Sequence, residues 1–128
     1  MTSNPPRPTE AELEILTILW SRGPATVREV HEAISARKPA QYTTTLKFMQ
    51  IMADKGLVRR DEKQRAHIYE AARPKEWTQR QLAGDLLQRA FNGSARSLML
   101  GALSSRKASK EELSELRRLL DEYEEGKQ

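Results

Sequence analysis

The sequence predicts a mainly α protein with one small β-hairpin, and two observations lead to this fold class. Three stretches in the first half of the chain have the polar caps and apolar periodicity of helices, and two short alternating runs then follow, separated by a charged segment. Further helical stretches with leucine stripes fill the rest of the 128 residues. A chain of this length buries roughly two-thirds of the surface that it exposes when unfolded, so one domain with a helical appendage is expected.

Capping signals define the first two helices. Thr9 followed by Glu12 is a capping box ahead of an apolar run that a Gly-Pro pair ends, which predicts a helix over about residues 10–22. Thr26 and Glu29 repeat the box and open a second helix, whose apolar residues share one stripe.

A third helix is expected over about residues 43–55, because the glycine at position 56 is typical of the residue after a helix end. At 100° per residue, this helix has one face that can contact a core and an opposite polar face. The core face holds Thr45, Phe48, Met49 and Met52; the polar face holds Thr43, Lys47, Gln50 and Asp54, flanked by Thr44 and Leu46.

The two alternating runs, residues 57–60 and 66–71, form a β-hairpin whose tip, residues 61–65, is charged. Three helices followed by a hairpin is the element order of a winged helix-turn-helix domain. We assign this domain to residues 1–74.

The remaining residues, 75–128, are predicted to form a helical dimerisation region. A fourth helix follows Pro74 and is interrupted at residues 92–94. The next run, residues 97–103, is apolar on nearly all sides and needs other residues to cover it. A last helix begins with a capping box at Ser109. A leucine stripe usually packs within its own domain, but no later segment of this sequence is available to cover these helices, so a second copy is the economical partner. The candidate dimerisation residues are Leu98, Leu100, Leu103, Leu113, Leu116, Leu119, Leu120 and Tyr123.

The composition excludes several classes of protein. Without cysteine, the chain has no disulfides, thiolate metal sites or cysteine nucleophiles, and a reducing compartment, the cytoplasm, is expected. No stretch approaches the roughly 18 apolar residues of a membrane span, and the first ten residues lack the apolar core of a signal peptide.

Charge is distributed unevenly along the chain. The formal net charge of +4 is by itself a weak indication of a polyanionic partner. Between Arg37 and Ile68, however, eight residues are basic and three are acidic, whereas from Lys107 to Gln128 five are basic and seven acidic. A basic middle and an acidic tail indicate surfaces with different roles.

Signals of catalysis are weak. His31 and Glu32 resemble the start of a zinc-protease helix, but Ser35 occupies the position of the second histidine ligand, and a partly buried structural histidine is the better interpretation. His67 lies in a predicted strand without a partner for catalysis. A glycine-rich phosphate loop and a nucleophile elbow are both absent from the sequence. We therefore expect no enzyme activity, cofactor or metal; a hydrolase using His31 and Glu32 is the remote alternative.

The polar face of the third helix predicts contact with double-stranded DNA. A helix that enters the major groove presents its N-terminal residues to base edges and phosphates, where short hydroxyl side chains allow a close approach. Lys47 would contact phosphate or a guanine edge, Gln50 would pair with adenine, and Leu46 would contact a thymine methyl group. The candidate DNA-binding residues are Thr43, Thr44, Leu46, Lys47, Gln50, Arg60, Lys63 and Arg65.

The hairpin is expected to follow the adjacent phosphate backbone through Lys63, Arg65 and whichever of Arg59 and Arg60 faces outward. Simpler interpretations stay open, because threonines near a helix start are often caps and a charged hairpin tip is usually only solvated. A winged helix that binds another protein, without strong DNA affinity, is the alternative function.

Six segments carry a family resemblance: EAELEILTILW, ATVREVHEAI, YTTTLKFMQIMADKGLVRR, AHIYEA, FNGSARSLML and EELSELRRLLDE. In order and spacing the chain resembles the penicillinase repressor (BlaI/MecI) family over about residues 8–124, with YTT before KGLV and the EELxELRxLL tail as the most specific pieces. The resemblance implies a homodimeric winged-helix transcriptional repressor that binds inverted repeats in promoters. It places Thr43, Thr44 and Lys47 in the major groove, and Lys63 and Arg65 in the wing.

The sequence differs from the family pattern at two points, and both concern how such a repressor is released from DNA. In antibiotic-responsive members, a membrane-bound sensor protease triggers cleavage of an Asn-Phe pair after the SLxL segment, where this chain has Gly101-Ala102. That difference argues against inactivation by the same cut. Copper-responsive relatives end in a cysteine-rich metal-binding tail, and the absence of cysteine excludes induction by that chemistry.

Overall fold

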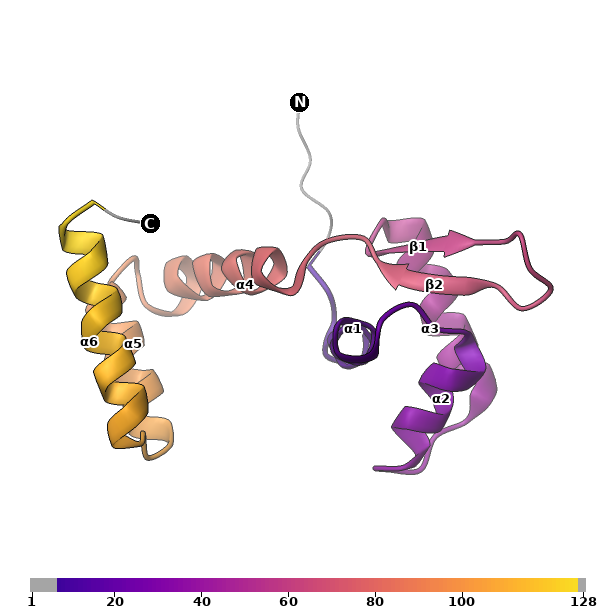
Figure 1. Ribbon diagram of the computed structural model, residues 1–128, viewed down its shortest axis with the longest axis horizontal. Helices are drawn as coiled ribbons and strands as arrows, with labels where there is room; N and C mark the ends of the chain where they lie inside the picture. Colours follow the sequence, from indigo (N-terminus) through magenta and orange to yellow (C-terminus); the bar gives the residue numbers. More distant parts are fainter. Residues whose placement is uncertain (1–6, 127–128) are drawn as a thin grey trace. The chain divides into compact units, whose positions relative to one another are not determined.

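The computed structural model describes residues 7–126, which divide into two compact units between Ala83 and Gly84. Residues 1–6 and 127–128, which the two predicted domains include, lie outside the described residues. Within the described part of the chain there are six helices and one two-stranded antiparallel sheet, which confirms the predicted fold class. The elements are α1 (Glu10–Arg22), α2 (Val27–Ser35), α3 (Tyr42–Lys55), β1 (Val58–Asp61), β2 (Ile68–Ala71), α4 (Lys75–Ala90), α5 (Ala95–Ser105) and α6 (Lys110–Glu124) (Figure 1).

Capping boxes begin α1 and α2, as predicted. The Thr9 hydroxyl accepts a hydrogen bond from the Glu12 amide at 3.2 Å, and Glu12 Oε1 accepts one from the Thr9 amide at 2.9 Å. Thr26 and Glu29 make the same two contacts at the start of α2. Each box satisfies two backbone N–H groups that have no acceptor within their own helix.

The third predicted box, at the start of α6, is only half formed. The Ser109 hydroxyl accepts a hydrogen bond from the Glu112 amide at 3.0 Å, as predicted. The Glu112 carboxylate, however, pairs with Arg106 at 3.1 Å. The arginine therefore takes the acceptor that the box would offer to the backbone of Ser109, and the spacing of serine and glutamate alone does not reveal this competition.

Helix α3 begins one residue before its predicted start and ends at the predicted glycine. Its N-cap is Gln41, whose side chain makes no capping hydrogen bond, so the threonines at positions 43–45 lie inside the helix and do not cap it. After the last turn, Gly56 adopts the left-handed conformation with φ 82° and ψ 14°. Glycine is favoured there because it has no Cβ to clash in that conformation.

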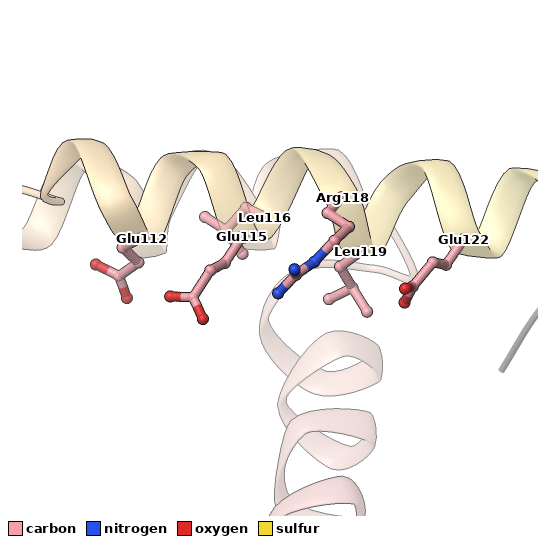
Figure 2. A pocket seen from close by; sticks show the side chains of 6 residues that line it. All are labelled: Glu112, Glu115, Leu116, Arg118, Leu119 and Glu122. Carbon is pink, nitrogen blue, oxygen red and sulfur yellow. The ribbon is translucent and has the colours of Figure 1, made fainter.

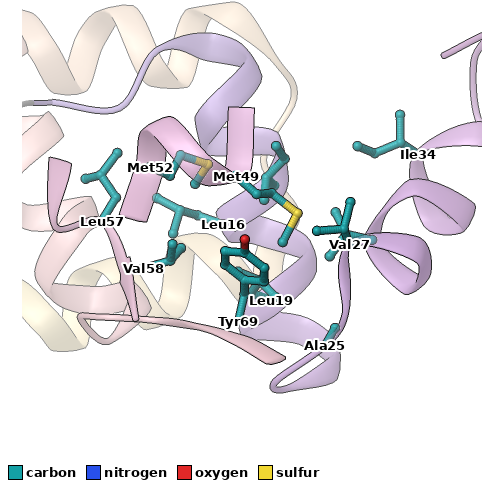
Figure 3. Close-up of a cluster of buried hydrophobic side chains, with 12 residues drawn as sticks. Leu16, Leu19, Ala25, Val27, Ile34, Met49, Met52, Leu57, Val58 and Tyr69 are labelled. Carbon is teal, nitrogen blue, oxygen red and sulfur yellow. The ribbon is translucent and has the colours of Figure 1, made fainter. Parts of the chain in front are cut away.

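The hydrophobic core of the N-terminal unit lies between the first three helices and the hairpin (Figure 3). On the predicted core face of α3, Thr45, Met49 and Met52 are buried and Phe48 is partly buried, which confirms the orientation of this helix. The buried apolar residues of the core are Ile15, Leu16, Leu19, Ala25, Val27, Val30, Ile34, Met49, Met52, Leu57, Val58 and Tyr69.

The hairpin is attached to the helices by a short backbone bridge. Strands β1 and β2 start one or two residues later than predicted and pair antiparallel, with Val58 opposite Ala71. Tyr69 also exchanges two backbone hydrogen bonds with Ala25, at 2.9 and 2.8 Å. Because Ala25 lies between α1 and α2, this bridge fixes the hairpin beside the helical part of the unit.

The first turn of α4 belongs to the N-terminal unit. The Trp20 indole N–H donates a hydrogen bond to the Arg73 carbonyl at 3.0 Å, and the Arg73 guanidinium lies 4.4 Å from the centre of the Trp77 ring. Thr78, one residue further along, is 6% exposed. These contacts hold the start of α4 against α1 within the N-terminal unit.

Candidate nucleic-acid interface

The face of α3 that points away from the core is polar and exposed. Thr43, Thr44, Lys47 and Gln50 are all exposed, whereas Leu46 is half-buried and packs on the core. Within residues 7–126, no carboxylate lies within ion-pair distance of Lys47. The sequence-predicted contacts on this helix therefore lie on one accessible surface.

Behind this surface, His31 connects α2 to α3. Its Nδ1 lies 3.4 Å from the Thr45 hydroxyl, and its Nε2 lies 3.2 Å from the Ser35 hydroxyl. The Tyr42 ring meets the imidazole edge-on, with ring centres 5.7 Å apart. Both ring nitrogens are thus occupied by neighbouring hydroxyls, which is the arrangement of a structural histidine.

A groove of about 610 Å³ lies between the start of α2, the outer part of α3 and the hairpin. Three arginines and one carboxylate, Glu62, contribute to its lining, so it favours an anionic ligand. Of the sequence-predicted DNA-binding residues, it brings together Leu46, Gln50, Arg60 and Arg65.

Most of the basic residues of the middle segment are paired with carboxylates. Glu14 of α1 binds both Arg37 and Lys38, and hydrogen bonds from Lys38 and then Arg37 hold its pKa below the ordinary value. Five of the eight basic residues counted between positions 37 and 68 form such pairs: Arg37, Lys38, Lys55, Arg59 and Arg60. In the described part of the chain, Lys47, Lys63 and Arg65 are the three that have no such partner.

The two neighbouring arginines of β1 point to different sides of the hairpin. Arg59 is the more exposed, with 66% of its side chain accessible, and pairs across the sheet with Glu70. Arg60 is 32% exposed, lines the groove and pairs with Glu62 at 2.7 Å. A hydrogen bond to Tyr69 and the pairing with Glu62 raise the pKa of Arg60, so its guanidinium stays charged beside the groove.

The hairpin tip presents two further cations. Lys63 and Arg65 are exposed, and the Lys63 amide donates to Asp61 Oδ1 at 2.9 Å, which fixes the turn. Lys63 does not line the groove, whereas Arg65 does. The tip therefore offers positive charge both inside the groove and beyond it.

Among the groove residues outside the predicted DNA-binding set, Arg28 contributes a cation and Tyr42 an aromatic ring. Tyr42 lies one residue before the start that the sequence predicted for the third helix. Arg28 belongs to the second helix, for which the sequence pattern predicts only the apolar stripe that packs on the core and no role for the outer face. The signal that identifies Arg28 is its position, because a cation in the first turn of a helix opposes the helix dipole.

The C-terminal unit has a different character. None of its described residues is buried, and the sequence-predicted dimerisation residues Leu98, Leu113 and Leu116 are only partly covered. On α6, Leu116 and Leu119 lie on one side of the helix among three glutamates and Arg118 (Figure 2). The exposed apolar residues from the predicted set are Leu100, Leu103, Leu119, Leu120 and Tyr123.

The Gly101-Ala102 pair lies inside α5 and not in a loop. A Cβ at Gly101 would lie 3.6 Å from the Phe91 ring, which is ordinary van der Waals contact. The backbone at this position is therefore helical and packed against an aromatic side chain.

Comparison with known proteins agrees with this architecture. The family described as Penicillinase repressor matches residues 8–122. The chain belongs to the penicillinase repressor family. A transcriptional regulator BlaI of Mycobacterium tuberculosis, found in strains CDC 1551 and H37Rv, is 36% identical over 118 residues, which are 91% of this chain and 85% of the relative. A penicillinase repressor of Bacillus licheniformis is 24% identical over 122 residues, which are 95% of each chain.

Members of the penicillinase repressor family are transcriptional regulators and not enzymes. The family membership thus confirms the resemblance seen in the six sequence segments. In the part of the chain that the structure describes, no helix has the length and apolar character needed to cross a membrane.

Proposed function

We propose that this penicillinase repressor family member represses transcription as a homodimer that binds inverted-repeat operator DNA in the cytoplasm. The N-terminal domain, residues 1–74, binds the DNA, and the helical region, residues 75–128, forms the dimer. Helix α3 enters the major groove, and the hairpin contacts the adjacent phosphate backbone.

One observation carries the DNA-binding part of this proposal. The cations of the middle segment that have no carboxylate partner within residues 7–126, Lys47, Lys63 and Arg65, all lie on α3 or the hairpin tip. Intramolecular pairs neutralise the other basic residues of this segment, so its available positive charge is concentrated where a winged helix meets DNA. The exposed hydroxyls of Thr43 and Thr44 add short donors beside Lys47.

The dimeric part of the proposal is supported by the uncovered apolar side chains of the C-terminal unit. Leu100 on α5 is 58% exposed, and Leu120 on α6 is 61% exposed. A second copy would cover them, and a two-fold dimer would place two α3 helices about one DNA turn, roughly 34–36 Å, or a multiple of it apart. That spacing matches an inverted-repeat operator.

Footprinting and a salt titration on the promoter DNA upstream of the protein's own gene test this function. The three unpaired cations of residues 37–68 in each protomer should by themselves give a bound dimer a slope of about −5 when the logarithm of the binding constant is plotted against that of the salt concentration. Protection of an inverted repeat with two chains per site is the expected result. Absence of protection at low salt would favour the alternative, a winged helix that binds another protein.

The Lys47→Ala variant tests the assignment of α3 to the major groove. It should weaken operator binding by about 1–3 kcal/mol, because it removes a phosphate or guanine contact. Lys107→Ala is the matched control, since Lys107 is an exposed lysine between α5 and α6 and no carboxylate of the described residues pairs with it. Equal affinities for the two variants at physiological salt would contradict the assignment.

We further propose that release from the operator does not depend on cleavage at Gly101-Ala102. The bond lies within α5, and a protease would have to unfold this helix to bind it in the extended form that cleavage requires. Specific cleavage of the purified protein at this bond by a cognate membrane sensor protease would disprove this proposal.

A further inference from the structure

The groove beside α3 extends to the start of α2, where Arg28 contributes a cation that the predicted DNA contacts leave out. Arg28 lines the groove from α2, and Arg65 lines it from the hairpin. Tyr42, the first residue of α3, lies between these elements in the chain and also lines the groove. Two cations from separate elements therefore contribute to one concave surface.

The position of Arg28 does not serve the stability of its own helix. It is the second residue of α2, where the positive end of the helix dipole disfavours a cation. The nearby carboxylate of Glu29 is engaged elsewhere, since it caps the helix through Thr26 and pairs with Arg22 at 3.2 Å. In the described part of the chain, no carboxylate pairs with Arg28.

An aromatic contact holds Arg28 in place without using its hydrogen-bond donors. The guanidinium carbon lies 5.7 Å from the centre of the Tyr42 ring, within the range of a cation–π contact. The Tyr42 ring also contacts His31: the two rings meet edge-on, with their centres 5.7 Å apart. A cation–π contact does not use the N–H groups of an arginine, and these donors match the geometry of a phosphate.

We infer that Arg28 and Tyr42 form a second phosphate-binding site, which contacts a phosphodiester of the DNA backbone in addition to the contacts from the hairpin. The guanidinium donates to the phosphate oxygens, and the Tyr42 ring positions the guanidinium. The inference rests on the proposed function, because the phosphate is supplied by DNA that lies along α3. A bound phosphate would also neutralise the charge of Arg28, which the dipole of α2 disfavours at this position.

The test compares the salt dependence of DNA binding between variants, measured by fluorescence anisotropy on the footprinted operator duplex and on a scrambled duplex of equal length. Arg28→Ala should weaken binding to both duplexes by about tenfold or more, and should reduce the salt slope of a dimer by about two units. Arg28→Lys should keep the slope but lose part of the affinity, because lysine lacks the planar fork. Arg80→Ala is the matched control, since Arg80 is exposed on α4 and does not line the groove.

Tyr42 variants separate positioning from direct contact. Tyr42→Phe keeps the ring and should bind DNA nearly as the wild type does, whereas Tyr42→Ala should lose affinity, and the loss should be smaller when Arg28 is already alanine. The thermal midpoint of Arg28→Ala should stay close to that of the wild type, because the loss of the contact with Tyr42 and the removal of a cation from the first turn of α2 have similar, opposite effects on stability. A loss of affinity without a loss of stability cannot come from unfolding.

The outcomes distinguish this inference from the proposed function. If Arg28→Ala and Arg80→Ala bind equally across the salt range while Lys47→Ala binds weakly, the second phosphate site is disproved and DNA binding through α3 stands. If the wild type binds neither duplex at low salt, the proposed function fails and the inference fails with it.

Discussion

Removing the Lys55 amine should destabilise the N-terminal unit more than removing the Glu12 charge, although both changes break the same ion pair. Lys55 Nζ lies 3.0 and 2.9 Å from the two carboxylate oxygens of Glu12, so the pair joins the start of α1 to the end of α3. The Glu12 side chain is 3% exposed, whereas that of Lys55 is 30% exposed. Lys55→Ala therefore leaves a buried carboxylate without its cation, while Glu12→Gln leaves an ammonium that can turn to water.

The expected losses follow from this difference in exposure. Removing one partner of a buried pair costs about 3–5 kcal/mol, and the hydrogen bond that Glu12 keeps from the Thr9 amide places Lys55→Ala near 3 kcal/mol. Glu12→Gln should cost about 1 kcal/mol, because glutamine preserves the capping box. The double variant should be more stable than Lys55→Ala, because no unpaired buried charge remains.

Equilibrium unfolding in urea, followed by the fluorescence of Trp20 and Trp77, measures these differences in the unit that contains both tryptophans. Lys47→Ala is the matched control on the same helix, since Lys47 is exposed and unpaired among residues 7–126, and it should change the stability by less than about 0.5 kcal/mol. A loss for Lys55→Ala no larger than that for Glu12→Gln would refute the reasoning.

The same pair predicts a dependence of stability on pH. Burial raises the pKa of Glu12, but hydrogen bonds from Lys55 and Thr9 outweigh it and bring the pKa below its ordinary value of 4.5. Because the pKa is lower in the folded state, the stabilisation is fully present above pH 4.5 and is lost as the pH falls through the folded-state pKa. The wild type should therefore lose more stability on acidification than Glu12→Gln, and equal losses would contradict the assignment.

Three further variants test the hairpin, the end of α3 and the proposed dimer. Glu62→Gln should tighten DNA binding and steepen its salt slope by about one unit per protomer, because Arg60 loses its carboxylate partner; weaker binding in an anisotropy titration would oppose this. Gly56→Ala should cost about 1 kcal/mol in thermal unfolding, since φ is 82° and the added Cβ meets only open space. Leu120→Asp should shift the proposed dimer toward monomer in analytical ultracentrifugation, and an unchanged dimer would remove Leu120 from the proposed interface.

The elements that the sequence predicted well depend on contacts between residues close in the chain. The boxes of Thr9 with Glu12 and Thr26 with Glu29 each join positions three residues apart, and both formed as predicted. The left-handed glycine at position 56 is equally local, because the conformation is required by the helix end itself. Such signals are independent of how the rest of the chain folds.

What the sequence could not predict depends on pairs that are distant in the chain. The Ala25 and Tyr69 backbone bridge has no side-chain signature, since any residue can make it. Likewise, the pairing of Glu14 with Arg37 joins α1 to the loop before α3, across 23 positions. Arg28 becomes a candidate ligand only when α2, α3 and the hairpin are seen to line one groove.

The count of charged residues in the segment between positions 37 and 68 overstated the positive charge on its surface, because it too ignored pairs with residues distant in the chain. The carboxylates of Glu12 and Glu14, which neutralise three of its basic residues, come from α1 and lie outside the segment. Residues 37–68 of one protomer are left with three cations that no carboxylate of the described residues neutralises, so the phosphate contacts of this segment alone supply modest affinity. Linking two protomers makes the second binding event intramolecular and multiplies that affinity without any new contact to DNA. On the proposed function, a signal that separated the C-terminal helices would therefore release the operator while leaving α3 and the hairpin unchanged.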